Sequence, residues 1–253
     1  GVVDTAVDVV ITADTGARVT LVDGWTQLVT GVISTLNPTS GQQGTVVTID
    51  GTDMLSGGSE VVSVTLAGVE VAEITRGNDD SELTVVAGTG SNAAGDVVMI
   101  SDSGAVVTKS DGWTYIEVGE ITQTSPSSGQ YGTVVTITGT NLFGGGASVQ
   151  SVQLNALEVL EIRTQSNTQL VVVVDDGEFG QGDIVITADT GAYTVATNGF
   201  TYLSLGEIIT VVPEFGLGGT RIVIEGDRLL GGGSSAELIT LAGVEIAELV
   251  SLS

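Results

Sequence analysis

NPTSGQQGTVVTIDGTDML (37–55) returns later in the same chain as SPSSGQYGTVVTITGTNLF (125–143). A looser copy, VPEFGLGGTRIVIEGDRLL, occupies residues 212–230. Each copy contains one of the chain's three prolines at the same place, and the prolines lie 88 and 87 residues apart (Pro38, Pro126 and Pro213). A fixed period of this size indicates an array of similar domains, each roughly 90 residues long.

The repeat divides the 253 residues into two complete units and two partial ones. We place the complete units at 31–118 and 119–205. Residues 1–30 match the C-terminal part of a unit, and residues 206–253 match the N-terminal part. We therefore expect the sequence to begin and end inside a unit, with the ends completed either by a longer chain or by other copies of the chain bound head to tail.

Within a unit, short apolar runs alternate with turn residues. Residues 61–74 predict two strands around a turn at 67–68, and residues 149–162 repeat this pattern. Residues 96–116 predict a hairpin with its turn at 103–104. No segment shows a sustained apolar period of 3.6 residues, so we expect almost no helix. About seven short strands per unit predict an all-β fold of tandem immunoglobulin-like β-sandwiches.

The motif around the second proline resembles the IPT/TIG domain, an immunoglobulin-like domain. The matching residues are Ile121, Pro126, Gly129, Gly132, Thr133, Val135, Thr136, Ile137, Gly139, Asn141 and Leu142. The third copy departs from the pattern at 214–215 and 227–228. Such domains occur in cell-surface receptors, bacterial and algal surface proteins, starch-acting enzymes and transcription factors. The resemblance therefore implies a fold and an accessory role rather than an activity.

The composition excludes several classes of function. The chain has no histidine and no cysteine, which removes the usual metal ligands, disulfides and thiol nucleophiles. Its net charge of −25 opposes binding to nucleic acid and to anionic lipid. The longest apolar run, residues 170–174, is far shorter than the ~18–20 residues that span a bilayer, so we expect no membrane insertion.

Three aspartates precede a turn glycine: Asp-Thr-Gly at 14–16 and 189–191, and Asp-Ser-Gly at 102–104. Two-lobed aspartic proteases carry a pair of Asp-Thr-Gly motifs, because two carboxylates that share a proton activate water. Here the motif has three copies, each inside a hairpin pattern. A turn explains all three, with aspartate capping the turn and glycine supplying a positive φ. We therefore expect no enzymatic activity.

An acidic cluster in the second unit is the candidate metal site, with Asp175, Asp176, Glu178 and Asp183 as calcium ligands. Of these four, the other complete unit keeps only the equivalent of Asp183, which is Asp96. A site built into an array should recur, so the pattern favours a solvated acidic loop without a cofactor.

Two other sets of residues recur in register. Glutamates occupy two fixed offsets, which we assign to the solvent face of alternating strands (Glu70, Glu158 and Glu245; Glu73, Glu161 and Glu248). Aromatic residues occupy a third offset, which we assign to the domain cores (Trp25, Trp113 and Phe200).

Together these features predict a structural, adhesive or filament-forming segment of a long extracellular or cell-surface protein. Residues 114–125 contain no flexible linker, so we expect a semi-rigid rod with similar rotations at its junctions. The expected partners are neighbouring repeats or other copies of the chain, then glycans or surface proteins. The alternatives are a carbohydrate- or surface-binding accessory module of a larger secreted enzyme, indicated by a nearby catalytic domain, and a receptor ectodomain, indicated by a transmembrane helix and a signalling domain.

Overall fold

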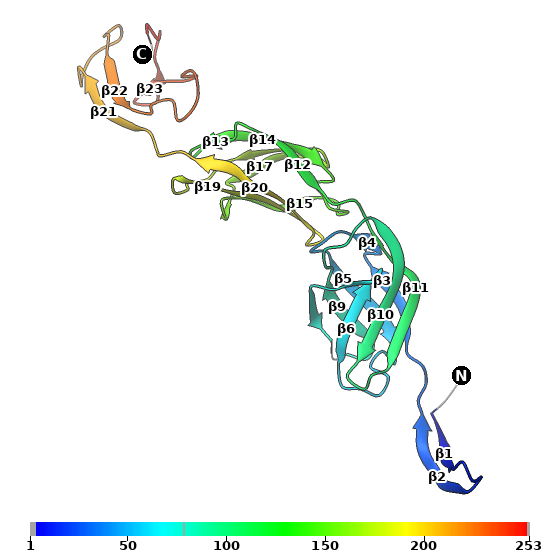
Figure 1. Ribbon diagram of the computed structural model, residues 1–253. Helices are drawn as coiled ribbons and strands as arrows, with labels where there is room; N and C mark the ends of the chain where they lie inside the picture. Colours follow the sequence, from blue (N-terminus) through cyan, green and yellow to red (C-terminus); the bar gives the residue numbers. More distant parts are fainter. Residues whose placement is uncertain (1–3, 78, 252–253) are drawn as a thin grey trace. The chain divides into compact units, whose positions relative to one another are not determined.

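A computed structural model describes residues 4–77 and 79–251 of the protein, and every regular element among them is a β-strand (Figure 1). The chain divides into two compact units. The first contains Gly1–Gly119 together with the segments Phe143–Ala147 and Ala188–Tyr193. The second contains Glu120–Leu142, Ser148–Thr187 and Thr194–Ser253. The all-β prediction is therefore confirmed.

The first complete repeat forms two sheets. One has the order β3-β5-β9-β8, from β3 (Val32–Asn37), β5 (Val46–Thr52), β9 (Glu82–Val86) and β8 (Glu73–Arg76). The other has the order β4-β11-β10-β6-β7, from β4 (Ser40–Gly41), β11 (Val106–Tyr115), β10 (Ala93–Ser101), β6 (Val61–Leu66) and β7 (Val69–Glu70). The run 61–74 thus supplies strands to both sheets, because β6 and β7 lie in one and β8 in the other.

The second complete repeat has the same topology. Its four-stranded sheet has the order β12-β14-β18-β17, from β12 (Glu120–Ser125), β14 (Val134–Thr140), β18 (Gln169–Val173) and β17 (Glu161–Gln165). Its five-stranded sheet has the order β13-β20-β19-β15-β16, from β13 (Ser128–Gly129), β20 (Tyr193–Tyr202), β19 (Gly180–Ala188), β15 (Val149–Leu154) and β16 (Leu157–Glu158). The short strands β4 and β13 pair in parallel with β11 and β20.

The two partial repeats form small sheets. At the N-terminus, β1 (Thr5–Thr12) and β2 (Arg18–Gln27) make an antiparallel hairpin. At the C-terminus, β21 (Glu207–Val212) pairs with β22 (Val223–Asp227), and β23 (Thr240–Leu241) pairs with β24 (Val244–Glu245). The register of the β1–β2 hairpin shifts between Val7 and Val9, just as that of β10–β11 shifts between Gly95 and Val97.

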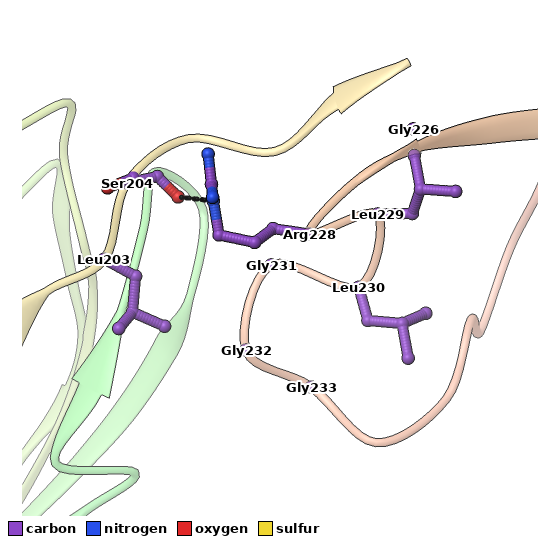
Figure 2. A pocket seen from close by; sticks show the side chains of 9 residues that line it. All are labelled: Leu203, Ser204, Gly226, Arg228, Leu229, Leu230, Gly231, Gly232 and Gly233. Carbon is purple, nitrogen blue, oxygen red and sulfur yellow. Dashed lines mark hydrogen bonds between the residues drawn. The ribbon is translucent and has the colours of Figure 1, made fainter. Parts of the chain in front are cut away.

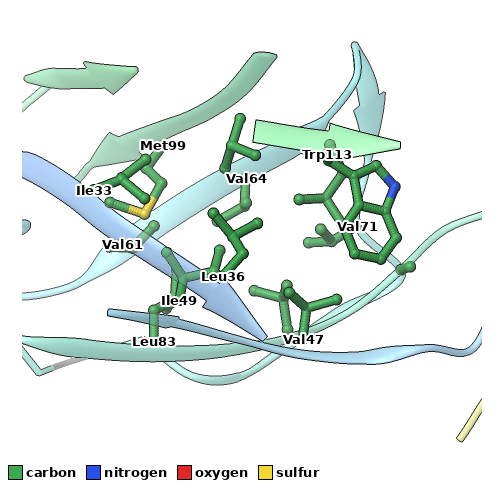
Figure 3. Packing of buried hydrophobic residues seen from close by; sticks show 14 of the residues in the cluster. Ile33, Leu36, Val47, Ile49, Val61, Val64, Val71, Leu83, Met99 and Trp113 are labelled. Carbon is green, nitrogen blue, oxygen red and sulfur yellow. The ribbon is translucent and has the colours of Figure 1, made fainter. Parts of the chain in front are cut away.

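The core of the first repeat lies between its two sheets, where alternate residues of facing strands are buried (Figure 3). Trp113 is completely buried and packs edge-on against Tyr115, with ring centroids 5.7 Å apart. In the second repeat Phe200 is buried in the same way against Tyr202, at 5.3 Å. Both residues are core anchors, as predicted.

Trp25 differs from this prediction, because 60% of it is exposed. All ten residues of β2, which carries Trp25, are exposed, as are all eight of β1. Among the described residues no second sheet covers this hairpin in the way that β5 and β9 cover β10 and β11. The burial of an aromatic anchor therefore depends on the facing sheet and not on the strand that carries it.

The turn motif G-x-x-G-T has a steric origin. In the second repeat the Gln130 N–H donates to Thr133 Oγ1 at 3.1 Å, which folds the threonine side chain back over the turn. A Cβ added to Gly129 would lie 2.5 Å from that oxygen, so the first glycine leaves room for the threonine. The second glycine, Gly132, has a φ of +82°. The third copy keeps this bond, since the Leu217 N–H donates to Thr220 Oγ1 at 2.9 Å.

This geometry predicts different behaviour for the two glycines. Gly129→Ala should destabilise the second repeat by about 1–3 kcal/mol through overpacking, and part of that loss should disappear in a Thr133→Ala background. Gly132→Ala should cost about 1–2 kcal/mol through its positive φ, with no change in that background, because nothing lies within 4 Å of its Cβ position. Denaturant unfolding of each glycine variant in both backgrounds, compared with the unmodified chain and with Thr133→Ala alone, measures both effects. Equal losses for Gly129→Ala in the two backgrounds would contradict the steric explanation.

Candidate functional site

The glycines of the Asp-Thr/Ser-Gly motifs have the positive φ predicted for them, at +85° for Gly16, +81° for Gly104 and +84° for Gly191. The role predicted for the aspartates needs correction. Asp102 accepts hydrogen bonds mainly from a different loop, from Ser59 N at 2.8 Å and Ser59 Oγ at 2.5 Å. Asp189 likewise accepts from Ala147 N at 3.1 Å. These carboxylates tie the hairpin turn to the loop before β6 or β15.

This arrangement is the opposite of a protease dyad. Two carboxylates that share a proton raise the pKa of one of them. The bonds from the Ser59 hydroxyl and the Ser59 N–H instead lower the pKa of Asp102. A carboxylate held ionised by loop donors stabilises the loop and is poorly suited to sharing a proton.

The lowered pKa predicts a pH-dependent contribution to stability. The folded Asp102 has a lower pKa than the unfolded one, so its contribution is complete above the unfolded pKa and is lost as the pH falls through the folded pKa. Asp102→Asn should therefore lower the melting temperature at neutral pH, and the difference should vanish in acid. Asp14→Asn, at the equivalent position of the N-terminal hairpin, is the control. A difference that persists unchanged at low pH would contradict this role.

Another local cluster lies between β8 and β9. Asp79 Oδ1 accepts from Ser81 N at 2.9 Å and from Ser81 Oγ at 2.7 Å, and Asp79 Oδ2 lies 2.7 Å from Arg76. These bonds and the Arg76 charge lower the pKa of Asp79 to about 2. The cluster closes a turn and leaves no free cation, because Arg76 also pairs with Glu82.

The candidate calcium ligands lie in two places. Asp175, Asp176 and Glu178 are in the loop between β18 and β19, and Asp183 is in β19. Asp183 Oδ1 accepts from Asn198 N at 2.8 Å. Across residues 4–77 and 79–251, no group of three or more acidic side chains is placed to hold a metal ion.

The role of Asp183 recurs in the two other copies that include its position. Asp96 accepts from Asp111 N at 2.9 Å, and Asp8 accepts from Asp23 N at 3.0 Å. The three donors all have a positive φ (Asp23, Asp111 and Asn198). The recurring aspartate thus bonds the backbone of the partner strand where the register of the last two strands of a repeat shifts. Its sequence position alone did not reveal this role.

We predict that calcium removal has no effect on this protein. Treatment with EDTA should leave the melting temperature unchanged at moderate salt, where the surface charges are screened. A large, saturable stabilisation by millimolar Ca²⁺, absent with monovalent salt at matched ionic strength, would contradict the prediction. If that stabilisation disappears in Asp175→Asn, the loop between β18 and β19 holds the ion.

The recurring glutamates are exposed, as predicted, but one set also has a structural role that the sequence analysis missed. Glu70 Oε1 accepts from Val64 N at 3.3 Å, and Glu70 Oε2 accepts from Ser63 Oγ at 3.2 Å. Glu158 repeats these bonds with Val152 and Ser151. The signal was a serine seven residues before the glutamate in both complete repeats, and the third copy has Leu238 there.

Two shallow hollows lie beside the connections between repeats. The one in the second unit, of about 380 Å³, is lined by Leu203, Ser204, Gly226, Arg228, Leu229, Leu230 and Gly231–Gly233 (Figure 2). Its one cation is engaged, because the Arg228 guanidinium donates to Ser204 O at 3.1 Å and to Leu205 O at 3.1 Å. The other hollow, in the first unit, is lined by Asp4, Leu28, Val29, Asp53, Ser56, Gly57 and Asp80. Its Asp4 and Asp80 carboxylates accept from the backbone of Val29 and Leu55.

Comparison with known proteins defines the family. The IPT/TIG domain matches residues 32–115 and 120–202, which is more than half of the chain. The chain therefore belongs to the IPT/TIG domain family, as its turn motif indicated. No match was found among curated proteins. None of the described residues forms a helix long and apolar enough to cross a membrane.

Comparison with solved structures finds matches in several kinds of protein. The plexin A4 extracellular region is 21% identical, with 78% of this chain and 18% of that chain covered and a TM-score of 0.42. SGBP-B from a complex xyloglucan utilization locus in Bacteroides uniformis is 19% identical, with 76% and 58% covered and a TM-score of 0.29. The I9–I11 tandem from titin is 13% identical, with 74% and 73% covered and a TM-score of 0.27. The chain spans less than two thirds of the length of the first two.

Proposed function

We propose that this chain is a non-catalytic spacer and binding segment of an extracellular or cell-surface protein, in which successive IPT/TIG sandwiches form a semi-rigid rod. The observation that carries the proposal is the length of the connections. Strand β11 ends at Tyr115 and β12 begins at Glu120, while β20 ends at Tyr202 and β21 begins at Glu207. Four residues leave little freedom between consecutive strands, whereas flexible linkers are long and rich in glycine and serine.

The chemistry of the surface supports the same proposal. Asp79 and Asp102, whose pKa values are lowered, hold loops and turns together, and Asp189 serves the same purpose. The net charge of −25 favours solubility and opposes nonspecific association between like surfaces. A chain with these properties suits a spacer that stays dissolved at high salt concentration.

Small-angle scattering on the full chain tests the proposed stiffness. We expect a narrow distribution of maximum dimensions that does not change with salt. A variant with six Gly-Ser residues inserted after Glu117 is the matched control and should give a broader distribution. If the unmodified chain already shows a broad ensemble of bent shapes, the proposed rod is wrong.

A second candidate function, glycan binding, is favoured by two exposed aromatic residues. Tyr131 is 55% exposed and Phe179 is 73% exposed. Their loops meet, because the Gly132 N–H donates to Val174 O at 2.9 Å at the start of the loop that carries Phe179. Exposed aromatic rings beside carboxylates suit sugars, which present both apolar faces and hydroxyl groups.

Neutral oligosaccharides immobilised on an array test this second function. Binding that is lost in Tyr131→Ala and in Phe179→Ala, but retained in Tyr193→Ala, would support a glycan platform at these loops. Absence of binding to every immobilised glycan, or equal binding by all three variants, would reject it. Either result leaves the proposed spacer function unaffected.

A further inference from the structure

A glutamine occupies the same position in both complete repeats, buried in the first and half-buried in the second. Gln42, after β4, is completely buried in the first unit. Its side-chain Oε1 accepts from Gly119 N at 2.6 Å, and its Nε2 donates to Tyr193 O at 2.9 Å. These partners are 77 and 151 residues away in sequence, and all belong to the first unit. One amide therefore bonds both the connection after β11 and a segment of the following repeat.

The glycine that faces this amide is required both by its size and by its φ of +55°. A Cβ added to Gly144 would lie 3.0 Å from Gln42 Nε2 and 2.7 Å from Ala192 Cβ. Backbone bonds hold the same segments together, from Val46 N to Thr190 O at 2.8 Å and from Tyr193 N to Gln43 O at 3.3 Å. The amide thus fits a surface with no side chain at position 144.

The second unit repeats the Oε1 bond and the glycine contact with its own residues. Gln130 Oε1 accepts from Gly206 N at 2.9 Å. A Cβ added to Gly231 would lie 2.6 Å from Gln130 Nε2. Gln130, Gly206 and Gly231 follow Gln42, Gly119 and Gly144 by one period of the repeat. The equivalent of Gln130 in the third copy is Leu217, and the equivalent of Gly144 in the first complete repeat is Ser56.

We propose that Gln42 and Gln130 are junction clips, each of which binds the backbone N–H of the connection after its repeat and seats against a glycine of the following repeat. The pairing of glutamine at one position with glycine at the other is then a compatibility rule for neighbouring repeats. A side chain larger than hydrogen at 144 or 231 displaces the amide, and an apolar residue at 42 or 130 leaves the connection without its acceptor. This inference rests on the proposed spacer function only for its biological use.

Hydrogen exchange at the connections of the full chain tests the clip. Gln42→Leu keeps a side chain of similar size but makes it apolar and removes both bonds, so exchange at Gly119 should become at least tenfold faster. Exchange at Gly206 should stay unchanged in this variant and should accelerate only in Gln130→Leu. Each variant is therefore the matched control of the other. Unchanged exchange at Gly119 in Gln42→Leu, with the repeats still folded, would overturn the proposal.

Gly144→Ala gives an independent test from the receiving side. If Gln42→Leu fails to fold, Gly144→Ala should still accelerate exchange at Gly119. Gly145→Ala is the control, because its Cβ position faces Ile116 and Gly41 and not the Gln42 amide. Equal exchange at Gly119 in Gly144→Ala and in the unmodified chain would also overturn the clip. The scattering result on the unmodified chain decides the rod separately, so a flexible chain with intact exchange behaviour rejects only the spacer function.

Discussion

Trp113→Ala should lower the free energy of unfolding of the first complete repeat by about 3–5 kcal/mol, the range for an aromatic residue deleted from a core. The side chain is completely buried on β11 and packs edge-on against Tyr115. Its removal leaves a cavity between the sheets that close-packed neighbours fill only in part. Small domains have about 5–15 kcal/mol of stability in total, so the variant repeat should be close to unfolding at physiological temperature.

Calorimetry or circular dichroism of the full chain measures this loss without depending on the tryptophan signal. Trp25→Ala is the matched control, because it removes the same residue one period earlier, where 60% of the side chain is exposed. It should change stability by no more than about 0.5 kcal/mol. If Trp113→Ala melts like the unmodified chain and instead loses binding to a glycan or a surface, Trp113 is a ligand platform and not a core anchor.

The strands and turns of this protein were predictable because each pattern occurs in more than one copy. The hairpin turn at 103–104 and the two-strand run at 61–74 required only local information, namely glycine at a positive φ and alternating apolar residues. The G-x-x-G-T motif predicted a turn, but its reason, the threonine side chain folded over the first glycine, needed coordinates.

The side-chain contacts between distant segments were not predictable in the same way. Asp102 was expected to cap its own turn, yet it bonds mainly to Ser59, because the fold places the loop before β6 beside the hairpin. The sequence around Gln42 indicates only a polar residue in a turn and does not reveal its partners, Gly119 and Tyr193. A periodic signal existed in both cases, but a repeated polar residue reveals its partner only when the topology is known.

The partial repeats at the two ends of the chain expose apolar residues whose equivalents are buried in the complete repeats. In the N-terminal hairpin Val9, Ile11 and Val19 are 39%, 67% and 70% exposed, whereas their equivalents in the first complete repeat, Val97, Met99 and Val107, are buried. At the other end, Leu229 and Leu241 are each 43% exposed, whereas their equivalents in the second complete repeat are buried (Leu142 and Leu154). The two ends carry different strands of one sandwich.

We therefore expect both ends to be covered in the native protein, either by a longer chain or by other copies bound head to tail, an arrangement that builds filaments because it does not close on itself. The mass of the protein from its natural source, measured under denaturing conditions, distinguishes the two arrangements. A species much heavier than 25.5 kDa means a continuous chain.

For the 253-residue chain alone, head-to-tail binding predicts assemblies that grow with concentration in light scattering. Ile11→Asp or Leu241→Asp should abolish them, and Val62→Asp, at an exposed position of a complete repeat, should not. A 25.5 kDa monomer at every concentration, with both end segments protected from hydrogen exchange, would contradict both arrangements. The reason is that unpaired strand edges and exposed apolar faces, like those of the two ends, are expected to be covered in a stable protein.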